Sequence, residues 1–195
     1  GRFRSSLIGE HNLANLVAVV GLLTWHGYGA ADIAEALATF QGVRRRQEIF
    51  GEPRGITLID DFAHHPTAVA VTIDATRLRF GSDRRLWVIF EPRTNTTRRN
   101  IFQEQYGRAF DGCDVLLVAP VHLAGSLAED ERFDPDKLVA DAREGGVDAR
   151  QATSVDDIVA DLAARARPDD VVLILSNGGF GGIYELLPAA LLAAG

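Results

Sequence analysis

The amino-acid sequence predicts an α/β fold in which a mostly parallel sheet is flanked by helices and preceded by a short helical segment. Continuous apolar runs at residues 86–90, 115–119 and 171–175 are typical of strands buried on both faces. Stretches with apolar residues at helical spacing alternate with these runs. Such alternation builds βαβ units, in which the strands run parallel.

The first 41 residues read as a helical pair. A helix is predicted over residues 11–27, because apolar residues recur at helical spacing from Leu13 to Val20 and glycines follow. A second helix begins near Asp32. Since a helical pair is not a complete domain, the sequence predicts a boundary that separates residues 1–41 from residues 42–195.

The second segment opens with a predicted hairpin. Residues 47–50 and 56–60 are β-like, and a stretch rich in glycine and proline separates them. Pro66 then opens a helix, at a position where its missing N–H costs nothing. Further helices are predicted from the capping residues Asp134 and Ser154 and over residues 183–192, with a short strand at residues 147–149.

Composition narrows the function class. The net charge of −7 argues against nucleic acid as a partner. Arginines nevertheless cluster at residues 44–54 and 93–99, which favours a small anionic ligand, although solvated surface arginines give the same pattern. The single cysteine, Cys113, predicts a small buried residue in a cytoplasmic protein. Without an initial methionine, a signal peptide or a membrane-length apolar run, the chain is expected to be a cytoplasmic fragment without membrane partners.

Polar or glycine-rich residues follow four of the predicted strands. These residues form the stretches 61–66, 91–96, 120–122 and 176–182, the third of which ends in His122. In parallel sheets, ligands bind beyond the carboxyl ends of the strands. The four stretches are therefore expected to gather around one site.

The stretch after the second predicted strand carries candidate nucleotide contacts. Asp61 can accept hydrogen bonds from ribose hydroxyls, or can serve only as a carboxylate near a helix N-terminus. His64 and His65 are adjacent, so their side chains point apart, and no Cys or Glu lies at ligand spacing. This disfavours a metal and favours a nucleotide or phosphate contact, with an ordinary turn histidine as the alternative for one of them.

Other polar residues suggest further contacts. Arg93 and Asn95 are suited to a carboxylate ligand, unless Arg93 is a plain surface residue. The glycines of residues 176–182 permit close approach of a ligand, or merely a turn with positive φ angles. Asn12 and Asn15 share one helix face and can read a purine edge, the alternative being polarity at a helix end.

Three motifs resemble the Mur ligase family, whose last domain is Rossmann-like. Gly9–Asn15 resembles the end of the central ATPase domain, residues 42–48 resemble the crossover, and residues 60–67 resemble ligases that act on UDP-N-acetylmuramate. Residues 90–96 and 176–183 are similar to the murein peptide ligases of this family. Ligases that add L-alanine usually carry a histidine-arginine-tyrosine phrase instead of residues 90–96.

The resemblance implies an ATP- and Mg²⁺-dependent amide ligase of peptidoglycan recycling. Such an enzyme joins L-alanyl-γ-D-glutamyl-meso-diaminopimelate to UDP-N-acetylmuramate through an acyl phosphate. It implies ATP contacts for Asn12, Asn15, Arg46, Asp61, His64 and His65. It implies tripeptide contacts for Arg93, Asn95, Ser176, Asn177, Gly178, Gly179 and Phe180.

The chain lacks the main groups that the resemblance requires for catalysis. There is no G-x-x-x-x-G-K-[ST] phosphate loop, and the only lysine is Lys137. The phosphate loop and metal ligands are expected in the missing central domain, so no catalytic residue or metal ligand is expected here and this fragment alone is expected to be inactive. Two alternatives stay open: an L-alanine-adding ligase, and a non-enzymatic module that binds a nucleotide or peptide.

Overall fold

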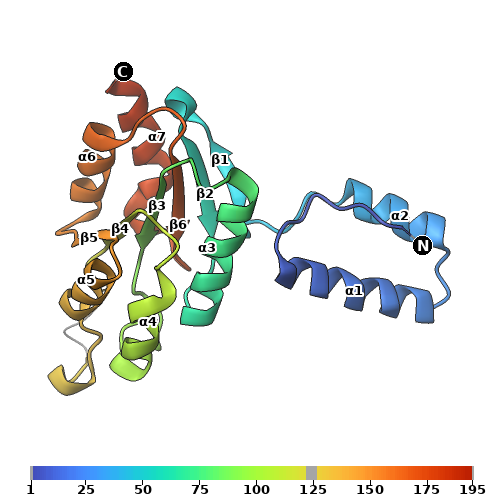
Figure 1. Ribbon diagram of the computed structural model, residues 1–195, viewed down its shortest axis with the longest axis horizontal. Coiled ribbons are helices and arrows are strands. Elements are labelled where there is room, and N and C mark those ends of the chain that lie inside the picture. Colours follow the sequence, from blue (N-terminus) through green and yellow to red (C-terminus); the bar gives the residue numbers. More distant parts are fainter. Residues whose placement is uncertain (1, 122–126, 195) are drawn as a thin grey trace. The chain divides into compact units, whose positions relative to one another are not determined.

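The computed structural model of the chain describes residues 2–121 and 127–194. The chain divides into two compact units, Gly1–Arg44 and Arg45–Gly195. The first unit is a helical pair, and the second unit contains the sheet (Figure 1). The second unit starts close to the boundary that the sequence predicts.

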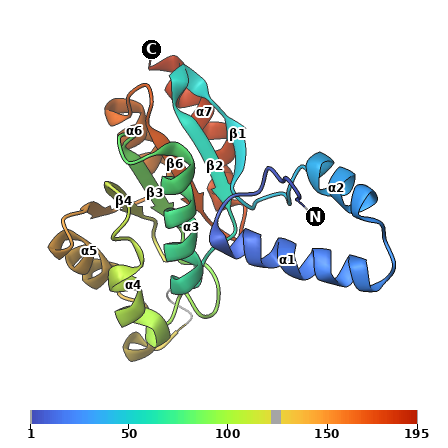
Figure 2. The ribbon, with the colours of Figure 1, turned by 45° about the vertical axis from the view of Figure 1, so that its right-hand side comes forward.

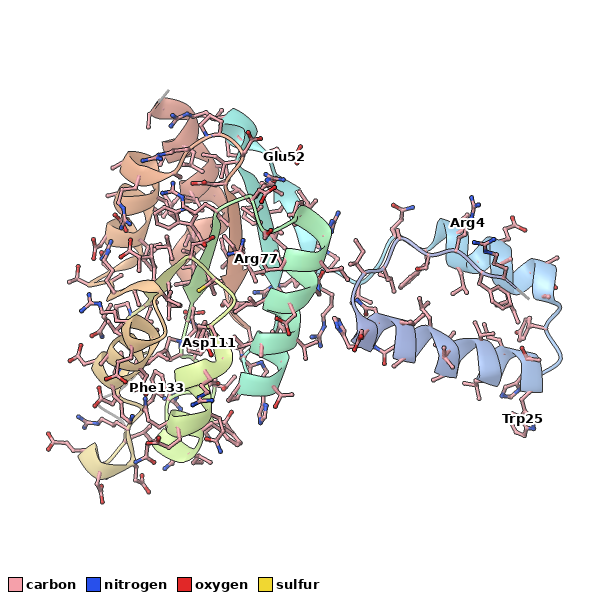
Figure 3. The ribbon with its side chains drawn as sticks, viewed as in Figure 1. Arg4, Trp25, Glu52, Arg77, Asp111 and Phe133 are labelled. Atoms are coloured by element: carbon pink, nitrogen blue, oxygen red, sulfur yellow. The ribbon has the colours of Figure 1, made fainter. Side chains whose placement is uncertain are left out.

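The first unit contains helices α1 (Glu10–Trp25) and α2 (Ala30–Thr39), as predicted. Ile33 and Leu37 of α2 are buried, whereas no residue of α1 is buried. The apolar residues of α1 therefore remain accessible. The clearest case is Trp25, which is 79% exposed and points away from its helix (Figure 3).

The second unit is built around a sheet that, within the described residues, has six strands in the order β1-β2-β6-β3-β4-β5. β1 pairs antiparallel with β2, and the other neighbouring strands pair in parallel. This arrangement confirms the predicted mostly parallel sheet. The strands are β1 (Glu48–Gly51), β2 (Thr57–Asp61), β3 (Leu86–Phe90), β4 (Val115–Val118), β5 (Asp148–Gln151) and β6 (Val171–Leu175).

Helices cover both faces of this sheet (Figures 1 and 2). They are α3 (Pro66–Phe80), α4 (Gln103–Ala109), α5 (Pro135–Glu144), α6 (Val155–Arg165) and α7 (Ile183–Ala193), with 3-10 turns η1 (Pro53–Gly55), η2 (Asn100–Phe102), η4 (Glu129–Glu131) and η5 (Phe180–Gly182). Apolar residues of α3, α4 and α5 pack on one face, and those of α6 and α7 pack on the other. Among the described residues, no helix is long and apolar enough to cross a bilayer.

Two apolar cores lie between the sheet and these helices. Side chains alternate between the faces along a strand, so Val88 and Phe90 enter the core beside α3, α4 and α5. Trp87 and Ile89 enter the core beside α6 and α7. Every residue of β2, β3, β4 and β6 is buried. Burial on both faces explains the continuous apolar runs of β3, β4 and β6, whereas β2 ends in the buried Asp60 and Asp61.

The predicted helix starts of α5 and α6 are confirmed by their caps. Asp134 Oδ1 accepts a hydrogen bond from the backbone N–H of Lys137 at 3.0 Å, and Ser154 Oγ accepts one from Asp157 at 3.0 Å. Such caps satisfy donors that the first turn of a helix leaves unpaired. Pro66 is the first residue of α3, also as predicted. The sequence did not predict α4.

Candidate functional site

The carboxyl ends of β2, β6 and β3 lie side by side at one edge of the sheet. Asp61 pairs with Leu175 across β2 and β6, and Leu175 pairs with Phe90 across β6 and β3. Beyond the strands, the N–H of Ser176 donates to the carbonyl of Asp61 at 3.2 Å, and the N–H of Glu91 donates to that of Leu175 at 3.0 Å. Three of the four predicted stretches therefore begin at one edge.

The fourth stretch follows β4, which is the neighbour of β3 on its other side. Pro120 is exposed and Val121 is half-buried at this strand end. His122 lies outside the described residues. The site is accordingly built from the ends of β2, β6 and β3.

Asp61 is held firmly in the structure. It is 3% exposed, and its two carboxylate oxygens accept backbone hydrogen bonds from Gln47 at 2.9 Å and Ala63 at 2.7 Å. Burial raises the pKa of the Asp61 carboxyl, against the two hydrogen bonds and the nearby charge of Arg46, which lower it. Each oxygen keeps a further lone pair with which it can accept a hydrogen bond from a ligand.

Arg45 joins the start of the second unit to two strand ends and a helix. Its Nε lies 2.8 Å from Asp60 Oδ2, and its Nη2 donates to the carbonyl of Ser176 at 2.8 Å and to the hydroxyl of Tyr184 at 2.9 Å. Tyr184 in turn donates to Asp60 at 2.9 Å. Sequence reasoning placed Arg45 only within a basic cluster, because these contacts join residues that are distant along the chain.

Arg46 and Gln47 lie close to Asp61. The guanidinium carbon of Arg46 is 5.9 Å from the centre of the Phe62 ring, and Arg46 is exposed. Gln47 has a positive φ of 50°, and its side-chain nitrogen is buried without a hydrogen-bond partner among the described residues. A buried unpaired donor is rare in folded proteins, so this amide is a candidate contact for a bound group.

His64 and His65 form the turn between β2 and α3. The Nδ1 atom of His64 lies 2.9 Å from the carbonyl oxygen of Phe62, while the backbone carbonyl of His64 accepts a hydrogen bond from the Tyr106 hydroxyl. His65 is exposed at the N-cap of α3, where its side chain accepts from the N–H of Thr67 at 3.4 Å. Within the described part of the chain, no cluster of His, Cys, Asp and Glu could hold a metal ion.

Arg93 contacts residues 176–182, the glycine loop that follows β6. Its Nη1 donates to Glu91 Oε1 at 3.2 Å, and the hydroxyl of Ser176 donates to the other oxygen of Glu91. Ser176 Oγ also accepts from the N–H of Gly178 at 3.0 Å. Glu91 is buried, whereas the Arg93 side chain is 34% exposed and remains open to a ligand. Sequence reasoning did not identify Glu91.

Asn95 lies in the exposed turn after Arg93. Its Oδ1 accepts a hydrogen bond from Arg98 Nη2 at 3.0 Å. The turn is also held by Thr97, whose N–H donates to the Thr94 hydroxyl at 3.1 Å. Asn95 therefore has a structural partner within its own loop, and its amide nitrogen is the group that can serve a ligand.

The residues at the end of the glycine loop differ in exposure. Asn177 is half-buried and Gly179 is exposed, so both remain accessible. Phe180 is only 1% exposed, and its side chain packs in the core beside α6 and α7. Burial of this aromatic ring in the core leaves the backbone of Phe180 as the part that a tripeptide can reach, and the predicted contact stays a prediction.

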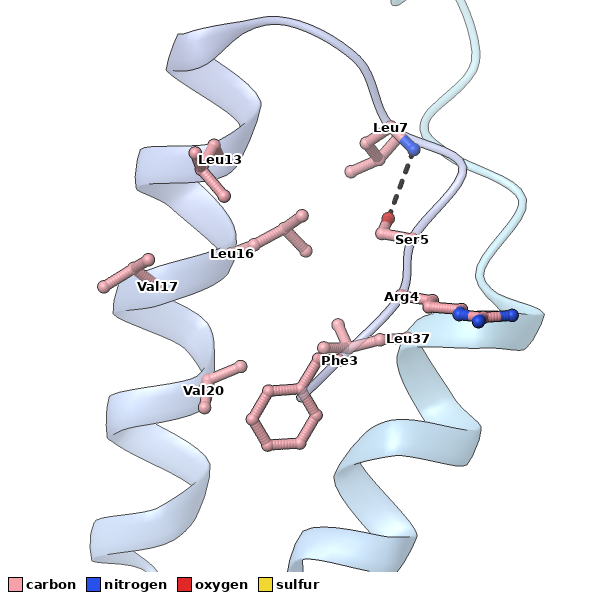
Figure 4. Close-up of a pocket in the computed structure, with 9 residues that line it drawn as sticks. All are labelled: Phe3, Arg4, Ser5, Leu7, Leu13, Leu16, Val17, Val20 and Leu37. Atoms are coloured by element: carbon pink, nitrogen blue, oxygen red, sulfur yellow. Dashed lines mark hydrogen bonds between the residues drawn. The ribbon is translucent and has the colours of Figure 1, made fainter. Parts of the chain in front are cut away.

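The two asparagines predicted to contact adenine belong to the first unit. Asn12 Nδ2 donates to the carbonyl of Ile8 at 2.7 Å, which leaves its oxygen as an acceptor. Asn15 is exposed. The first unit also has an apolar groove of about 440 Å³, lined by residues such as Phe3, Leu16 and Leu37 (Figure 4). Neither asparagine lines this groove.

Comparison with known proteins identifies the family. The family described as Mur ligase, glutamate ligase domain matches residues 45–178. The UDP-N-acetylmuramate--L-alanyl-gamma-D-glutamyl-meso-2,6-diaminoheptandioate ligase of Escherichia coli (strain K12) is 36% identical over 189 residues, which are 96% of this chain and 39% of that protein. The UDP-N-acetylmuramate--L-alanine ligase of Roseiflexus sp. (strain RS-1) is 37% identical over 96% of this chain and 39% of its own length.

Solved structures agree with this relationship. A murein peptide ligase from Psychrobacter arcticus 273-4 superposes with a TM-score of 0.73 at 32% identity, over 97% of this chain and 38% of that one. A UDP-N-acetylmuramate-alanine ligase from Thermotoga maritima has a TM-score of 0.80 at 21% identity, over 99% of this chain and 40% of that one, and so shares the fold. This chain thus spans about two fifths of the length of its relatives. It belongs to the Mur ligase family, and residues 45–178 match the family's glutamate ligase domain.

Proposed function

We propose that this chain is the C-terminal part of an ATP-dependent amide ligase that joins L-alanyl-γ-D-glutamyl-meso-diaminopimelate to UDP-N-acetylmuramate. The proposal rests on one observation: Asp61, Arg93 and Gly178 lie at the ends of three neighbouring parallel strands. A nucleotide and a carboxylate-bearing peptide can both be held at such an edge. The 36% identity to the Escherichia coli ligase that acts on this peptide supports the choice of substrate.

ATP is proposed to contact the residues around Asp61. The Asp61 carboxylate would accept from the ribose hydroxyls, and Arg46 would lie near the phosphates. The burial of Asp61, the exposure of Arg46 and the unpaired amide of Gln47 fit a polar anionic ligand. His64 and His65 would line the same loop, and the resemblance to the family makes Asn12 and Asn15 candidate adenine contacts.

The tripeptide is proposed to bind at the ends of β3 and β6. The Arg93 guanidinium would hold one peptide carboxylate through two parallel hydrogen bonds. The side chains of Asn95 and Asn177 and the backbone of Gly178 and Gly179 would supply further contacts, while Ser176 shapes the loop by accepting a hydrogen bond from the N–H of Gly178. Phe180 would contribute only its backbone.

The reaction would proceed in two steps. The γ-phosphoryl group of ATP passes to a carboxylate oxygen of UDP-N-acetylmuramate, and ADP leaves. The peptide amine then attacks the carbonyl carbon of the acyl phosphate and a new C–N bond forms. The C–O bond to the phosphate breaks, and inorganic phosphate leaves with the proton that the amine gives up. This chain would orient the amine and complete the ATP site. Holding the reacting groups close together in the right orientation lowers the activation barrier of the reaction.

The groups that transfer the phosphoryl are proposed to lie elsewhere in the full-length protein. Residues 1–41 would be the helical tail of a central domain that supplies the phosphate loop and the ligands of Mg²⁺. The sole lysine of this sequence, Lys137, lies in α5 and is paired with Asp141 at 2.9 Å. The 195-residue chain alone should therefore form no amide product from ATP.

Assays of the full-length protein test the proposal. ATP-dependent ligation should occur with the tripeptide and should not occur with L-alanine. In calorimetry, Arg93→Ala should weaken tripeptide binding at least about tenfold, as expected for loss of a bidentate pair. Arg99→Ala removes an arginine whose described partner is the exposed Glu131, and serves as the matched control. Unchanged tripeptide affinity in Arg93→Ala would contradict the assignment.

A second candidate is ligation of L-alanine to UDP-N-acetylmuramate. The 37% identity to the Roseiflexus L-alanine ligase favours it. Ligation of L-alanine but not of the tripeptide by the full-length protein would establish this reading. Absence of ligation with both substrates, together with nucleotide or peptide binding, would favour a non-enzymatic binding module.

A further inference from the structure

We infer that Glu91 and Gly178 are positioning residues that hold the Arg93 guanidinium in place for a peptide carboxylate. The inference rests on the proposed function, because it concerns the orientation of the arginine that is proposed to bind the tripeptide. It adds Glu91, which does not itself have to touch the substrate, and it gives Gly178 a positioning role besides its proposed backbone contact.

The sheet places Glu91 opposite Ser176. Phe90 and Leu175 are paired in the last register position of β3 and β6, so the next residue of each strand, Glu91 and Ser176, leaves the sheet at the same level. The Glu91 carboxylate is buried and accepts from the Ser176 hydroxyl through one oxygen. Its other oxygen is therefore directed to Arg93, 3.2 Å away.

A buried carboxylate needs a partner of opposite charge, because burial of an isolated charge is costly. Arg93 provides that charge to Glu91 with Nη1 alone. The guanidinium has five N–H donors, so most of them stay available for a second carboxylate. The pair thus fixes the direction of the arginine without using up its binding capacity.

Gly178 lies against the same arginine. A Cβ atom at Gly178 would lie 2.3 Å from Nε, 2.5 Å from Cδ and 2.7 Å from Cζ of Arg93. The guanidinium thus occupies the space that any other residue would fill. Gly178 does not have a positive φ, so its backbone alone does not require glycine. The packing of Arg93 is the reason for glycine at this position.

Two single variants of the full-length ligase test the inference independently. Glu91→Gln removes the charge but keeps the size of the side chain. Gly178→Ala removes no polar group and displaces the guanidinium. Each should raise the KM for the tripeptide about tenfold, while the KM for ATP and the melting temperature stay close to the parent values. Glu104→Gln, which changes an exposed carboxylate, and Gly21→Ala, whose added Cβ would meet no atom within 4 Å, are the controls.

The double variants show whether these residues act through Arg93. In the Arg93→Ala background, neither Glu91→Gln nor Gly178→Ala should raise the KM further. The inference would be overturned if either substitution raised the tripeptide KM in the Arg93→Ala background as much as it does in the parent. It would also be overturned if Arg93→Ala raised this KM but both single variants kept the parent value. An unimpaired Arg93→Ala would instead contradict the proposed function. If Glu91→Gln fails to fold, the Gly178→Ala pair still decides the question.

Discussion

Arg45 Nε lies 2.8 Å from Asp60 Oδ2, and this ion pair ties the first residue of the second unit to the end of β2. The Asp60 side chain is only 9% exposed and that of Arg45 is 29% exposed. The same guanidinium reaches the end of β6 and α7. Burial raises the pKa of the Tyr184 hydroxyl, as does Asp60, so Tyr184 remains a donor to that carboxylate at neutral pH.

Arg45→Ala should lower the free energy of unfolding of the second unit by about 2–4 kcal/mol, because it leaves Asp60 buried without its cation. Chemical denaturation, followed by the fluorescence of the buried Trp87, measures the change. Arg44→Ala alters a neighbouring exposed arginine and should change stability by less than about 0.5 kcal/mol. Equal effects of the two variants would contradict this prediction.

Asp170→Ala should cost about 3–5 kcal/mol of unfolding free energy, because several buried donors lose their acceptor at once. Asp170 Oδ2 accepts from Arg85 Nη2 at 2.6 Å, from Trp87 Nε1 at 2.9 Å and from the N–H of Arg167 at 2.9 Å. Glu129→Ala is the control, because the Glu129 side chain is 93% exposed and 4.0 Å from Arg132. A melting temperature of Asp170→Ala equal to that of the control would exclude this role for Asp170.

Asp61→Asn should change how stability depends on pH. Burial raises the folded-state pKa of this carboxyl above 3.8, so between pH 3.8 and the raised pKa the folded state binds more protons than the unfolded state. The contribution of Asp61 to stability is therefore full below pH 3.8 and is lost as the pH rises through the raised pKa. Denaturation at a series of pH values should show the parent losing stability relative to Asp61→Asn across this window, whereas parallel curves would contradict the prediction.

Cys113 should be almost inert in the folded chain. It is 6% exposed, and burial raises the pKa of its thiol to about 12, so very little thiolate is present at neutral pH. Alkylation by iodoacetamide at about pH 8 should be at least about 100-fold slower in the native chain than in denaturant. Because Cys113 is the only cysteine, mass spectrometry reports this rate directly. Comparable rates in both conditions would show that this core opens readily.

Local pattern was sufficient to predict the central strands. β3 and β6 have the predicted bounds, because both strands are buried on both faces and are apolar throughout. The helix α4 was not predicted, since it has only seven residues, includes Gly107 and depends on burial of Tyr106. Strand β5 begins one residue later than predicted, at Asp148, because an edge strand carries a weaker apolar signal.

The candidate site could be predicted only where a residue follows a strand. Asp61 and Arg93 were predicted in this way, and the pairing of β2, β6 and β3 brings them to one edge. Arg45 was overlooked because its partners Ser176 and Tyr184 are 131 and 139 residues away along the chain. Such partners become visible only once the strand order is known.

The adjacency of β3 and β6 has a consequence for engineering substrate choice. The loop that carries Arg93 and the loop that carries Gly178 interlock through Glu91 and Ser176, and one added methyl group at Gly178 would collide with the arginine. Replacement of one loop alone would leave the buried Glu91 carboxylate without a partner, or would place a new side chain against the Arg93 guanidinium. In this chain, replacement of one of these loops therefore requires that the other be replaced with it.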